Sequence, residues 1–484
     1  MTTIKLDPGA ALLLDALHGA GHAAYAVGGC VRDSLLGLDP HDWDLCTSAR
    51  PEQVMALFGE EKCIPTGLQH GTVTVKQGGR LYETTTFRTE GAYSDGRHPD
   101  AVCFVPDVRE DLARRDFTIN AMAYSAEEGL IDPFGGRDDL AAHLVRAVGE
   151  PERRFEEDAL RILRLYRFAA RFGFAIDPAT GAAARALGPH LDCVSAERIQ
   201  EELLKLLAAP RPGSYLEPAV LAVVLPELEP EKQPERFAEL CRTIDRIEPT
   251  VENVPARLAA LLCPLGEAGA RKALRKLKCS NALTDEVTAL EREAGGGAGS
   301  FLLGHEFELR HPADALCLER HSHPAGRCPN SNSLFPPQAA VVTVAGHSIA
   351  RPIACGNRVP PQWTVLGETP GTPNTTLTVQ AKRLLGRYEL PTIQRLTALC
   401  SARHPEQTGA FAALRAEAER LTAENACCRV SQLAVNGRDL MAAGVRPGPG
   451  LRQVLNALLE AVITGQTPNE KDALLAAAAQ FSAS

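Results

Sequence analysis

Two aspartates, Asp42 and Asp44, flank Trp43 in the stretch YAVGGCVRDSLLGLDPHDWDLCTSA. In a strand, residues i and i+2 point to the same side, so the spacing predicts two carboxylates on one face. Such a pair can hold magnesium ions, which prefer oxygen ligands. It suits a two-metal displacement, in which one ion activates an attacking hydroxyl and the other neutralises charge on a triphosphate and its leaving pyrophosphate. The alternative is an exposed surface turn, the common setting of an isolated D-x-D.

Residues around the pair favour a site that handles phosphate. Gly28 and Gly29 precede Arg32 and Asp33 at a predicted junction between a strand and a helix. Glycine lets backbone N–H groups approach a phosphate closely, and the N-terminus of a following helix favours its charge. Glu83, in YETTTFR, is a candidate for a third carboxylate near the metals. The alternatives are a glycine pair that only punctuates the chain and a strand glutamate that is merely exposed.

The predicted secondary structure changes along the chain from a mixed α/β pattern to a helical one. The part up to about Gly149 mixes short β-rich runs with glycine turns and predicts an α/β segment. Within it, strand-like runs over 72–75 and 81–87 meet across Gly78 and Gly79, which predicts a hairpin. From 151 to about 290 the pattern is helical, with breaks such as APRPGS and EPEKQPE.

The second half contains a predicted linker and a segment whose composition differs from that of its neighbours. EREAGGGAGS reads as a loose linker. Residues 328–380 contain eight prolines and only three charged residues, with no sustained helical or strand period, so we interpret them as an insertion. The helical pattern resumes near Ala381 and continues to the end. With only two cations, Arg351 and Arg358, the insertion is not expected to bind RNA.

Composition bounds the class of protein. A net charge of −9 in 484 residues argues against a protein coated with positive charge, so any RNA contact must come from local basic patches. No apolar run approaches the length of a membrane span, and the N-terminus lacks a basic, long-apolar leader. The fourteen cysteines include no C-x-x-C pair, which predicts reduced thiols in a cytoplasmic protein without membrane contact.

Motif order carries a resemblance to a known family. GGCVRD followed by HDWDLCTSA resembles the signature of the class II CCA-adding enzyme and poly(A) polymerase superfamily. TFRTEGAYSDGRHPD is similar to that family's flexible loop, and EDLARRDFTINAMAY to its next motif. RFEEDALRILRLYRFAARFGF and SAERIQEELLKLL are similar to the two helical motifs after that. All follow the family's order across residues 25–207, and the tail from AVNGRDLMAAG onward resembles long bacterial members.

The resemblance implies an α+β fold: a polymerase-β-like nucleotidyltransferase head, with a small mixed sheet and helices, then all-α neck, body and tail domains. It implies template-independent addition of CCA to the 3′ end of tRNA from CTP and ATP, with release of pyrophosphate and with Mg²⁺ as cofactor, by a monomer or homodimer. The rivals are a poly(A) polymerase, a partial enzyme that adds only CC or only A, and a catalytically inactive RNA-binding protein. The expected segments are a head at 1–149, a neck at 150–210, a tRNA-binding body at 211–327, the insertion at 328–380 and a tRNA-binding tail at 381–484.

The stretch EEDALRILRLYRFAAR is expected to form one helix that reads the base. At 100° per residue an arc of about 80° collects four charged side chains, with two more at its edges. The four are Glu157, Arg161, Arg164 and Arg171, and the edges are Asp158 and Arg167. The packing face opposite holds Ile162, Leu163, Tyr166 and Ala170. The alternative is a solvated charged face.

By resemblance, Asp158 and Arg161 serve as a protein template for the base. Cytosine and adenine both present an amine donor beside a ring-nitrogen acceptor, and uracil and guanine reverse both. An acceptor beside a donor pairs with the first two and leaves buried groups unpaired against the others. The full set expected to bind nucleotide is Gly29, Arg32, Arg115, Asp158, Arg161, Arg164 and Arg167.

Two further clusters have weaker patterns. RKALRKLK is a candidate contact with the tRNA backbone, and the alternative is a charged helix face. Its cations are Arg271, Lys272, Arg275, Lys276 and Lys278. Metal-like residue types also occur together at Cys317, His321, His323 and Cys328. Their irregular spacing matches no zinc pattern, so zinc is not expected.

Overall fold

The computed structural model describes residues 3–90, 102–295 and 375–481. Its N-terminal part is built on a mixed seven-stranded sheet, in the order β3-β4-β5-β2-β1-β8-β9. Strands β2 and β5 run parallel, and the other neighbours are antiparallel. The strands are β1 Ala24–Val27, β2 Leu45–Thr47, β3 Cys63–Gly67, β4 Thr72–Gln77, β5 Arg80–Thr86, β8 Ala123–Ser125 and β9 Gly129–Ile131.

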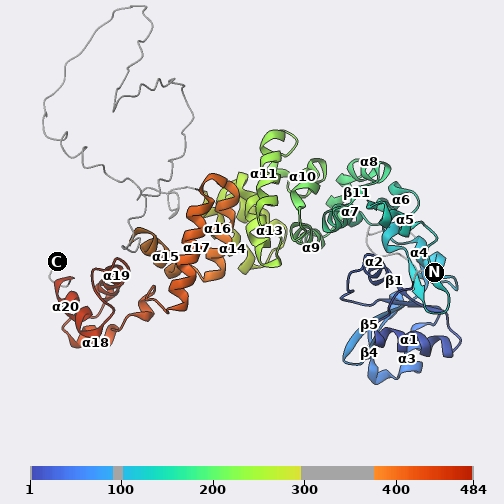
Figure 1. Ribbon diagram of the computed structural model, residues 1–484, viewed down its shortest axis with the longest axis horizontal. Coiled ribbons are helices and arrows are strands. Elements are labelled where there is room, and N and C mark those ends of the chain that lie inside the picture. Colours follow the sequence, from blue (N-terminus) through green and yellow to red (C-terminus); the bar gives the residue numbers. More distant parts are fainter. Residues whose placement is uncertain (1–2, 91–101, 296–374, 482–484) are drawn as a thin grey trace, which may run out of the picture. The chain divides into compact units, whose positions relative to one another are not determined.

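Helices pack against this sheet because their apolar residues recur at helical spacing. The first is α1 (Pro8–Gly19), in which Leu13, Leu14 and Leu17 are buried. The Asp7 side chain caps its N-terminus by accepting hydrogen bonds from the backbone N–H groups of Gly9 and Ala10. Helix α1 contacts β1 and α3 (Pro51–Phe58), and α3 contacts β4 (Figure 1).

The predicted hairpin is confirmed. Strands β4 and β5 pair from Thr72 opposite Thr85 to Gln77 opposite Arg80, so the turn consists of Gly78 and Gly79 alone. Both glycines have positive φ, 58° and 80°, as a two-residue type I′ hairpin turn requires. The turn therefore fixes the register between β4 and β5, and the last residues of β5 pair with β2.

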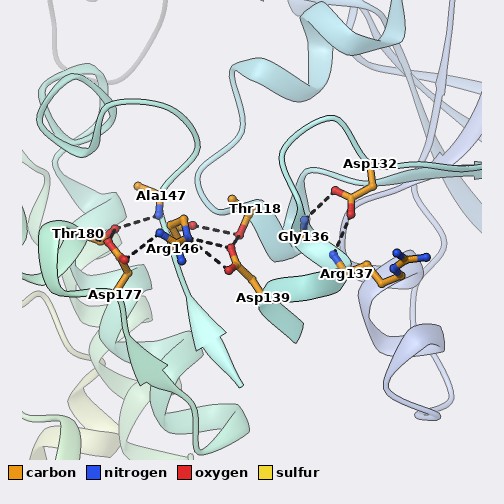
Figure 2. A network of polar contacts seen from close by, with 9 residues as sticks. All are labelled: Thr118, Asp132, Gly136, Arg137, Asp139, Arg146, Ala147, Asp177 and Thr180. Carbon is orange, nitrogen blue, oxygen red and sulfur yellow. Dashed lines mark hydrogen bonds and ion pairs between the residues drawn. The ribbon is translucent and has the colours of Figure 1, made fainter. Parts of the chain in front are cut away.

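Short elements lie between β5 and β8 and again after β9, where the chain leads into the helical part. They are β6 Arg88–Glu90, β7 Val102–Phe104, α4 Val108–Ala113, the 3₁₀ turn η3 Thr118–Asn120, α5 Gly136–Ala141 and β10 Leu144–Val145. Strand β10 pairs in parallel with β11 (Ala175–Ile176), which lies beyond α6 and α7 in the sequence. Arg146 strengthens this junction, because its guanidinium contacts both Asp139 and Asp177 (Figure 2).

The rest of the described chain is almost entirely helical (Figure 1). Helix α16 packs on α12 and α14, so segments on both sides of residues 296–374 share one core. The C-terminal helices α18, α19 and α20 bury a separate apolar cluster that includes Leu440 and Leu458. The helices up to the gap are α6 Pro151–Glu157, α7 Leu160–Phe172, α8 Pro178–Ala186, α9 Ala196–Leu207, α10 Pro218–Val224, α11 Pro234–Arg246, α12 Val254–Leu262, α13 Gly266–Lys276 and α14 Asn281–Ala294. Those after it are α15 Thr375–Arg387, α16 Leu390–Arg403, α17 Thr408–Ala423, α18 Gly437–Ala442, α19 Pro449–Ile463 and α20 Lys471–Phe481.

The expected α+β fold with a mixed-sheet head and a helical remainder is confirmed, but two element boundaries were wrong. Helix α14 extends to Ala294, so the first residues of the expected linker are helical. Helix α15 begins at Thr375, so 375–380 belong to a helix and not to an irregular insertion. Most of that insertion and the Cys317–Cys328 cluster lie outside the described residues, and the domain boundaries stay predictions.

Two expectations about the whole chain can be compared with the described residues. Among the helices there, none is both long and apolar enough to cross a membrane. The cysteines that the structure describes are all free. Cys103 and Cys193 are exposed, while most of the others are buried or half-buried.

Candidate active site

The glycine pair forms the turn between β1 and α2 (Gly29–Leu35), as the sequence predicted. Gly28 has φ 77° and donates its backbone N–H to the carbonyl of Met122 at 3.0 Å. A Cβ atom at Gly28 would lie 2.8 Å from Nη1 of Arg115, so only glycine lets this guanidinium approach the turn. Among the described residues, Nε of Arg115 is buried and has no hydrogen-bond partner. Arg115 therefore stands against the glycine turn with donor capacity left.

Asp44, the residue before β2, lies beside Glu83, which is in the middle of the parallel neighbour β5. The register pairs Leu45 of β2 with Thr84 of β5, so the residue before each strand position is aligned as well. Aligned residues of parallel neighbours point to the same face, and both carboxylates are exposed there, opposite the buried Leu45 and Thr84. Asp42 and Asp44 were expected within a strand, but both precede β2 in an irregular segment, since the ladder begins only at Leu45.

Mutual repulsion marks these carboxylates as neighbours. The pKa of Asp44 is raised to about 6, first because surrounding protein atoms desolvate it, then by the charges of Glu83 and Asp42. The positive charge of Arg115 opposes the rise. Asp42 itself is exposed and accepts a hydrogen bond of 2.9 Å from Nδ1 of His41. A cation between the carboxylates would relieve the repulsion.

The donor set fits magnesium better than a metal held by protein ligands alone. Within the described ranges no group of three His, Cys, Asp or Glu side chains is arranged to hold a metal ion, so Asp42, Asp44 and Glu83 do not form a closed three-ligand site. Mg²⁺ is usually held by one or two carboxylates and completes its octahedron with waters and substrate phosphates. Two aspartates on an exposed edge meet that requirement.

Arg32 is engaged inside the protein. It is 3% exposed and contacts the Asp33 carboxylate at 2.7 and 2.8 Å through Nη2 and Nε. Its Nη1 donates to the Asn120 side chain, and its guanidinium carbon lies 4.8 Å from the centre of the Phe172 ring. Arg32 therefore links α2 to η3 and α7 next to the glycine turn. Its described contacts are with protein groups, which favours a structural role over direct contact with a nucleotide.

The expected single base-reading helix was wrong, because the chain breaks at Asp158. Asp158 is extended, with φ −149° and ψ 103°, and separates α6 from α7. Its side chain accepts the N–H of Leu160 at 3.1 Å, so it caps the new helix instead of continuing the old one. Its other carboxylate oxygen accepts a hydrogen bond of 2.7 Å from Arg198 of α9.

Arg161 is held by hydrogen bonds to protein groups and does not lie on a solvated helix face. It is 9% exposed, and its Nη1 donates to the Glu157 carboxylate at 2.6 Å and to the Arg154 carbonyl at 3.0 Å. Its Nη2 donates to the carbonyl of Arg114 at 3.0 Å. Among the described contacts this leaves two of its five N–H groups uncommitted, and a carboxylate such as Asp158 accepts more than two hydrogen bonds. No described contact joins the Asp158 and Arg161 side chains.

Arg164 and Arg167 of α7, together with Arg32 of α2, lie around the Phe168 ring. Arg164 donates to Asp116 from Nε and Nη2, and Arg167 lies 2.6 Å from the Glu202 carboxylate. The guanidinium carbons of Arg32, Arg164 and Arg167 are 5.2, 5.4 and 4.1 Å from the ring centre. This clustering stabilises the cations on α7 next to the η3 segment. The expected packing face is confirmed, since Ile162, Leu163, Tyr166 and Ala170 are buried.

Sequence reasoning missed Asp116, Asn120 and Glu202, the partners of these arginines, and Arg198, the partner of Asp158. Glu202 did carry a signal. It follows Ile199 by three residues on α9 and precedes Leu206 by four, so a carboxylate occupies a buried helical position that favours apolar residues. At such a position a charge needs a partner, here Arg167.

The basic stretch at 271–278 forms the end of α13 and the turn after it. Arg271 is paired with Asp285 at 2.9 Å and donates to Thr288 at 2.8 Å. The other four cations are exposed: Lys272, Arg275, Lys276 and Lys278. Four of the five expected cations are therefore exposed, while Arg271 is half-buried and engaged with α14, and their contact with tRNA stays a prediction.

Three family models match separate parts of the chain. Residues 24–146 match the Poly A polymerase head domain, and residues 173–231 match the probable RNA and SrmB-binding site of polymerase A. Residues 391–478 match a model described as tRNA nucleotidyltransferase domain 2, putative. The head match contains the glycine turn, the carboxylates and Arg115.

Similar proteins extend the likeness to nearly the full length. The CCA-adding enzyme of Levilactobacillus brevis is 34% identical over 465 residues, which cover 96% of each chain. That of Lactiplantibacillus plantarum is 32% identical over 466 residues, 96% of this chain and 93% of the relative. The crystal structure of the Bacillus stearothermophilus CCA-adding enzyme in complex with CTP has a TM-score of 0.70 and 29% identity, and covers 98% of both chains. The chain therefore belongs to the family of CCA-adding enzymes.

Proposed function

We propose that this protein adds the nucleotides of CCA to the 3′ end of tRNA from CTP and ATP, without a nucleic-acid template, and that Asp42 and Asp44 hold the Mg²⁺ required. The observation that carries the mechanism is the convergence of Asp44, Glu83 and Arg115 beside the Gly28 turn. Carboxylates for a cation and a guanidinium for phosphate are the groups that nucleotidyl transfer needs. The relatives' name, CCA-adding enzyme, supports tRNA as the acceptor, and the relative's complex with CTP supports CTP as a substrate.

The carboxylates and the turn have separate tasks in this proposal. Mg²⁺ bound at Asp42 and Asp44 would activate the attacking 3′-hydroxyl and neutralise charge on the triphosphate and on the departing pyrophosphate. Glu83 is the third carboxylate of the proposed site. Arg115 binds the triphosphate above the turn at Gly28 and Gly29, since a planar guanidinium matches phosphate oxygens.

Base selection is assigned to the break between α6 and α7. Asp158 keeps acceptor capacity for the exocyclic amine of cytosine or adenine, and Arg161 keeps N–H donors for the adjacent ring nitrogen. Uracil and guanine would set donor against donor and acceptor against acceptor. Arg164 and Arg167 supply positive charge toward the triphosphate or ribose, and Arg32 supports the turn from below.

The exposed cations of α13 are proposed to contact the tRNA backbone. Lys272, Arg275, Lys276 and Lys278 give a local basic surface on a protein of net negative charge. Family membership also supports a cytoplasmic location, where tRNA is the substrate.

The function is tested with a tRNA that lacks its CCA end. The protein is incubated with that tRNA, Mg²⁺ and each nucleoside triphosphate alone or in pairs. Incorporation of C from CTP excludes a poly(A) polymerase. Absence of pyrophosphate release with every triphosphate would contradict the proposal and favour an inactive RNA-binding protein.

A further inference from the structure

A buried carboxylate next to Arg115 has no part in the reaction proposed above. Asp111 lies on α4, is 0% exposed and has no route to substrate through solvent. Placing a charge in the interior is costly unless partners compensate it fully. Its contacts should therefore reveal what it stabilises.

Asp111 accepts hydrogen bonds from three residues, and one of them is the Arg115 that lies against the glycine turn. Oδ1 accepts a hydrogen bond from Nε of Arg114 at 3.0 Å and from the backbone N–H of Arg88 at 3.3 Å. Oδ2 accepts one from Nη2 of Arg115 at 3.3 Å. One carboxylate thus joins the first residue of β6 to two consecutive arginines after α4.

The bond to Arg115 determines where that guanidinium lies. Nη2 is held by Asp111, and Nη1 lies 2.8 Å from the position that a Cβ atom at residue 28 would take. Nε has no acceptor among the described residues. With one end of the guanidinium fixed from behind, the other N–H groups stay available on the side of the glycine turn.

We propose that Asp111 is a positioning residue that fixes the Arg115 guanidinium over the Gly28 turn, ready for the triphosphate. The inference rests on the proposed role of Arg115 in nucleotide binding. Asp111 is fully buried, and among its described partners Arg88, Arg114 and Arg115 only Arg115 is proposed to bind nucleotide. Its loss should therefore weaken nucleotide binding and leave the choice of base unchanged.

A double-mutant cycle tests the coupling. KM and kcat for CTP and ATP are measured with Asp111→Asn, Arg115→Ala and the double variant, on a tRNA lacking CCA. We expect Asp111→Asn to raise both KM values about tenfold, with kcat changed about twofold at most, and to add less than about twofold in the Arg115→Ala background. The discrimination against UTP and GTP should equal that of the unaltered protein.

Asp139→Asn is the matched control. Asp139 is also a buried carboxylate that pairs with an arginine, but its partners are Thr118 and Arg146 (Figure 2). It should act independently of Arg115, so its effects should add to those of Arg115→Ala. If Asp111→Asn does not fold, Asp111→Glu keeps the charge, displaces the acceptor by one methylene and enters the same cycle.

The outcomes separate the inference from the function beneath it. An unchanged KM in Arg115→Ala would refute the nucleotide-binding role of Arg115 and the inference with it. A raised KM in Arg115→Ala, combined with an equally large effect of Asp111→Asn in both backgrounds, would refute only the inference. A cycle in which the second substitution adds nothing supports it.

Discussion

Arg164 donates two hydrogen bonds to one carboxylate oxygen of Asp116, from Nε at 2.9 Å and from Nη2 at 2.6 Å. The pair joins α7 to the segment before η3. Asn120 also donates to Asp116 at 3.0 Å and accepts from Arg32, so one polar chain connects the glycine turn with α7. Burial alone would raise the pKa of Asp116, but Arg164 and the Asn120 hydrogen bond outweigh it and hold that pKa well below its ordinary value of 3.8.

Asp116→Asn should lower the free energy of unfolding at pH 7 by about 1 to 3 kcal/mol, because Arg164 loses its charged partner. The loss is limited because the Arg164 side chain is one-third exposed and solvent screens its charge. A carboxylate with a lowered folded-state pKa stabilises above the unfolded-state value and loses that contribution as the pH falls through its folded-state pKa. The gap between protein and variant should therefore narrow between about pH 5 and about pH 2. Urea unfolding across that range measures it, with the exposed Asp15→Asn as control. A gap independent of pH would contradict the ion-pair assignment.

Asp42→Ala and Asp44→Ala should each abolish addition of both C and A while the fold survives. One remaining aspartate, even with Glu83 beside it, cannot hold the ions in position, so turnover should fall at least about a hundredfold. Single-turnover addition and thermal unfolding are measured side by side, with Asp39→Ala as a control in the same loop. Near-normal turnover of either variant in Mg²⁺ would show that the metal ligands lie elsewhere.

Asp158→Ala should reduce discrimination against UTP and GTP more than it weakens binding of the triphosphate. Loss of a charge-assisted acceptor costs on the order of 1.5–3 kcal/mol, about tenfold to a hundredfold in kcat/KM for the correct base. Glu197→Ala removes an exposed carboxylate of α9 beside Arg198 and serves as the control. Equal losses for all four nucleotides would remove Asp158 from base selection.

Much of the local structure was predictable from sequence, and the exceptions share a cause. The hairpin, the glycine junction and the packing face of α7 follow from patterns within a few residues. The break at Asp158 was missed because the flanking residues favour a helix on both sides. The partners of Arg164 and Arg171 lie 48 and 138 positions away, and only the folded chain brings them together. Local periodicity therefore placed the arginines but not the carboxylates that hold them.

Glu291 of α14 should make stability depend on pH near neutrality. Burial raises the pKa of its carboxyl to about 7, and the charge of Arg403 only partly opposes this. The folded state keeps a proton that the unfolded state releases near its ordinary value of 4.5, so stability should fall as the pH rises from about 4.5 to about 7.

The free energy of unfolding of Glu291→Gln should not show this fall. Its difference from that of the unaltered protein should grow in favour of the variant by on the order of 2–3 kcal/mol from pH 5 to pH 8. Urea unfolding at both pH values measures the difference. Glu267→Gln, which removes a surface carboxylate paired with Arg292, is the control. If the free energies of unfolding of Glu291→Gln and the unaltered protein differ by the same amount at both pH values, the Glu291 carboxyl does not have a raised pKa.

The most direct measurement of the central claim is the sequence of tRNA 3′ ends after the reaction. The full chain is supplied with Mg²⁺ and tRNAs that end before CCA, after C or after CC, and the products are sequenced. With CTP and ATP together every acceptor should end in CCA, and with CTP alone the first two should stop at CC. Neither UTP nor GTP should be incorporated, and the Asp42→Ala protein should leave all ends unchanged. With both nucleotides present, long adenosine tracts, ends that stop at CC, or extension of only the acceptor that already ends in CC would contradict full CCA addition by this protein.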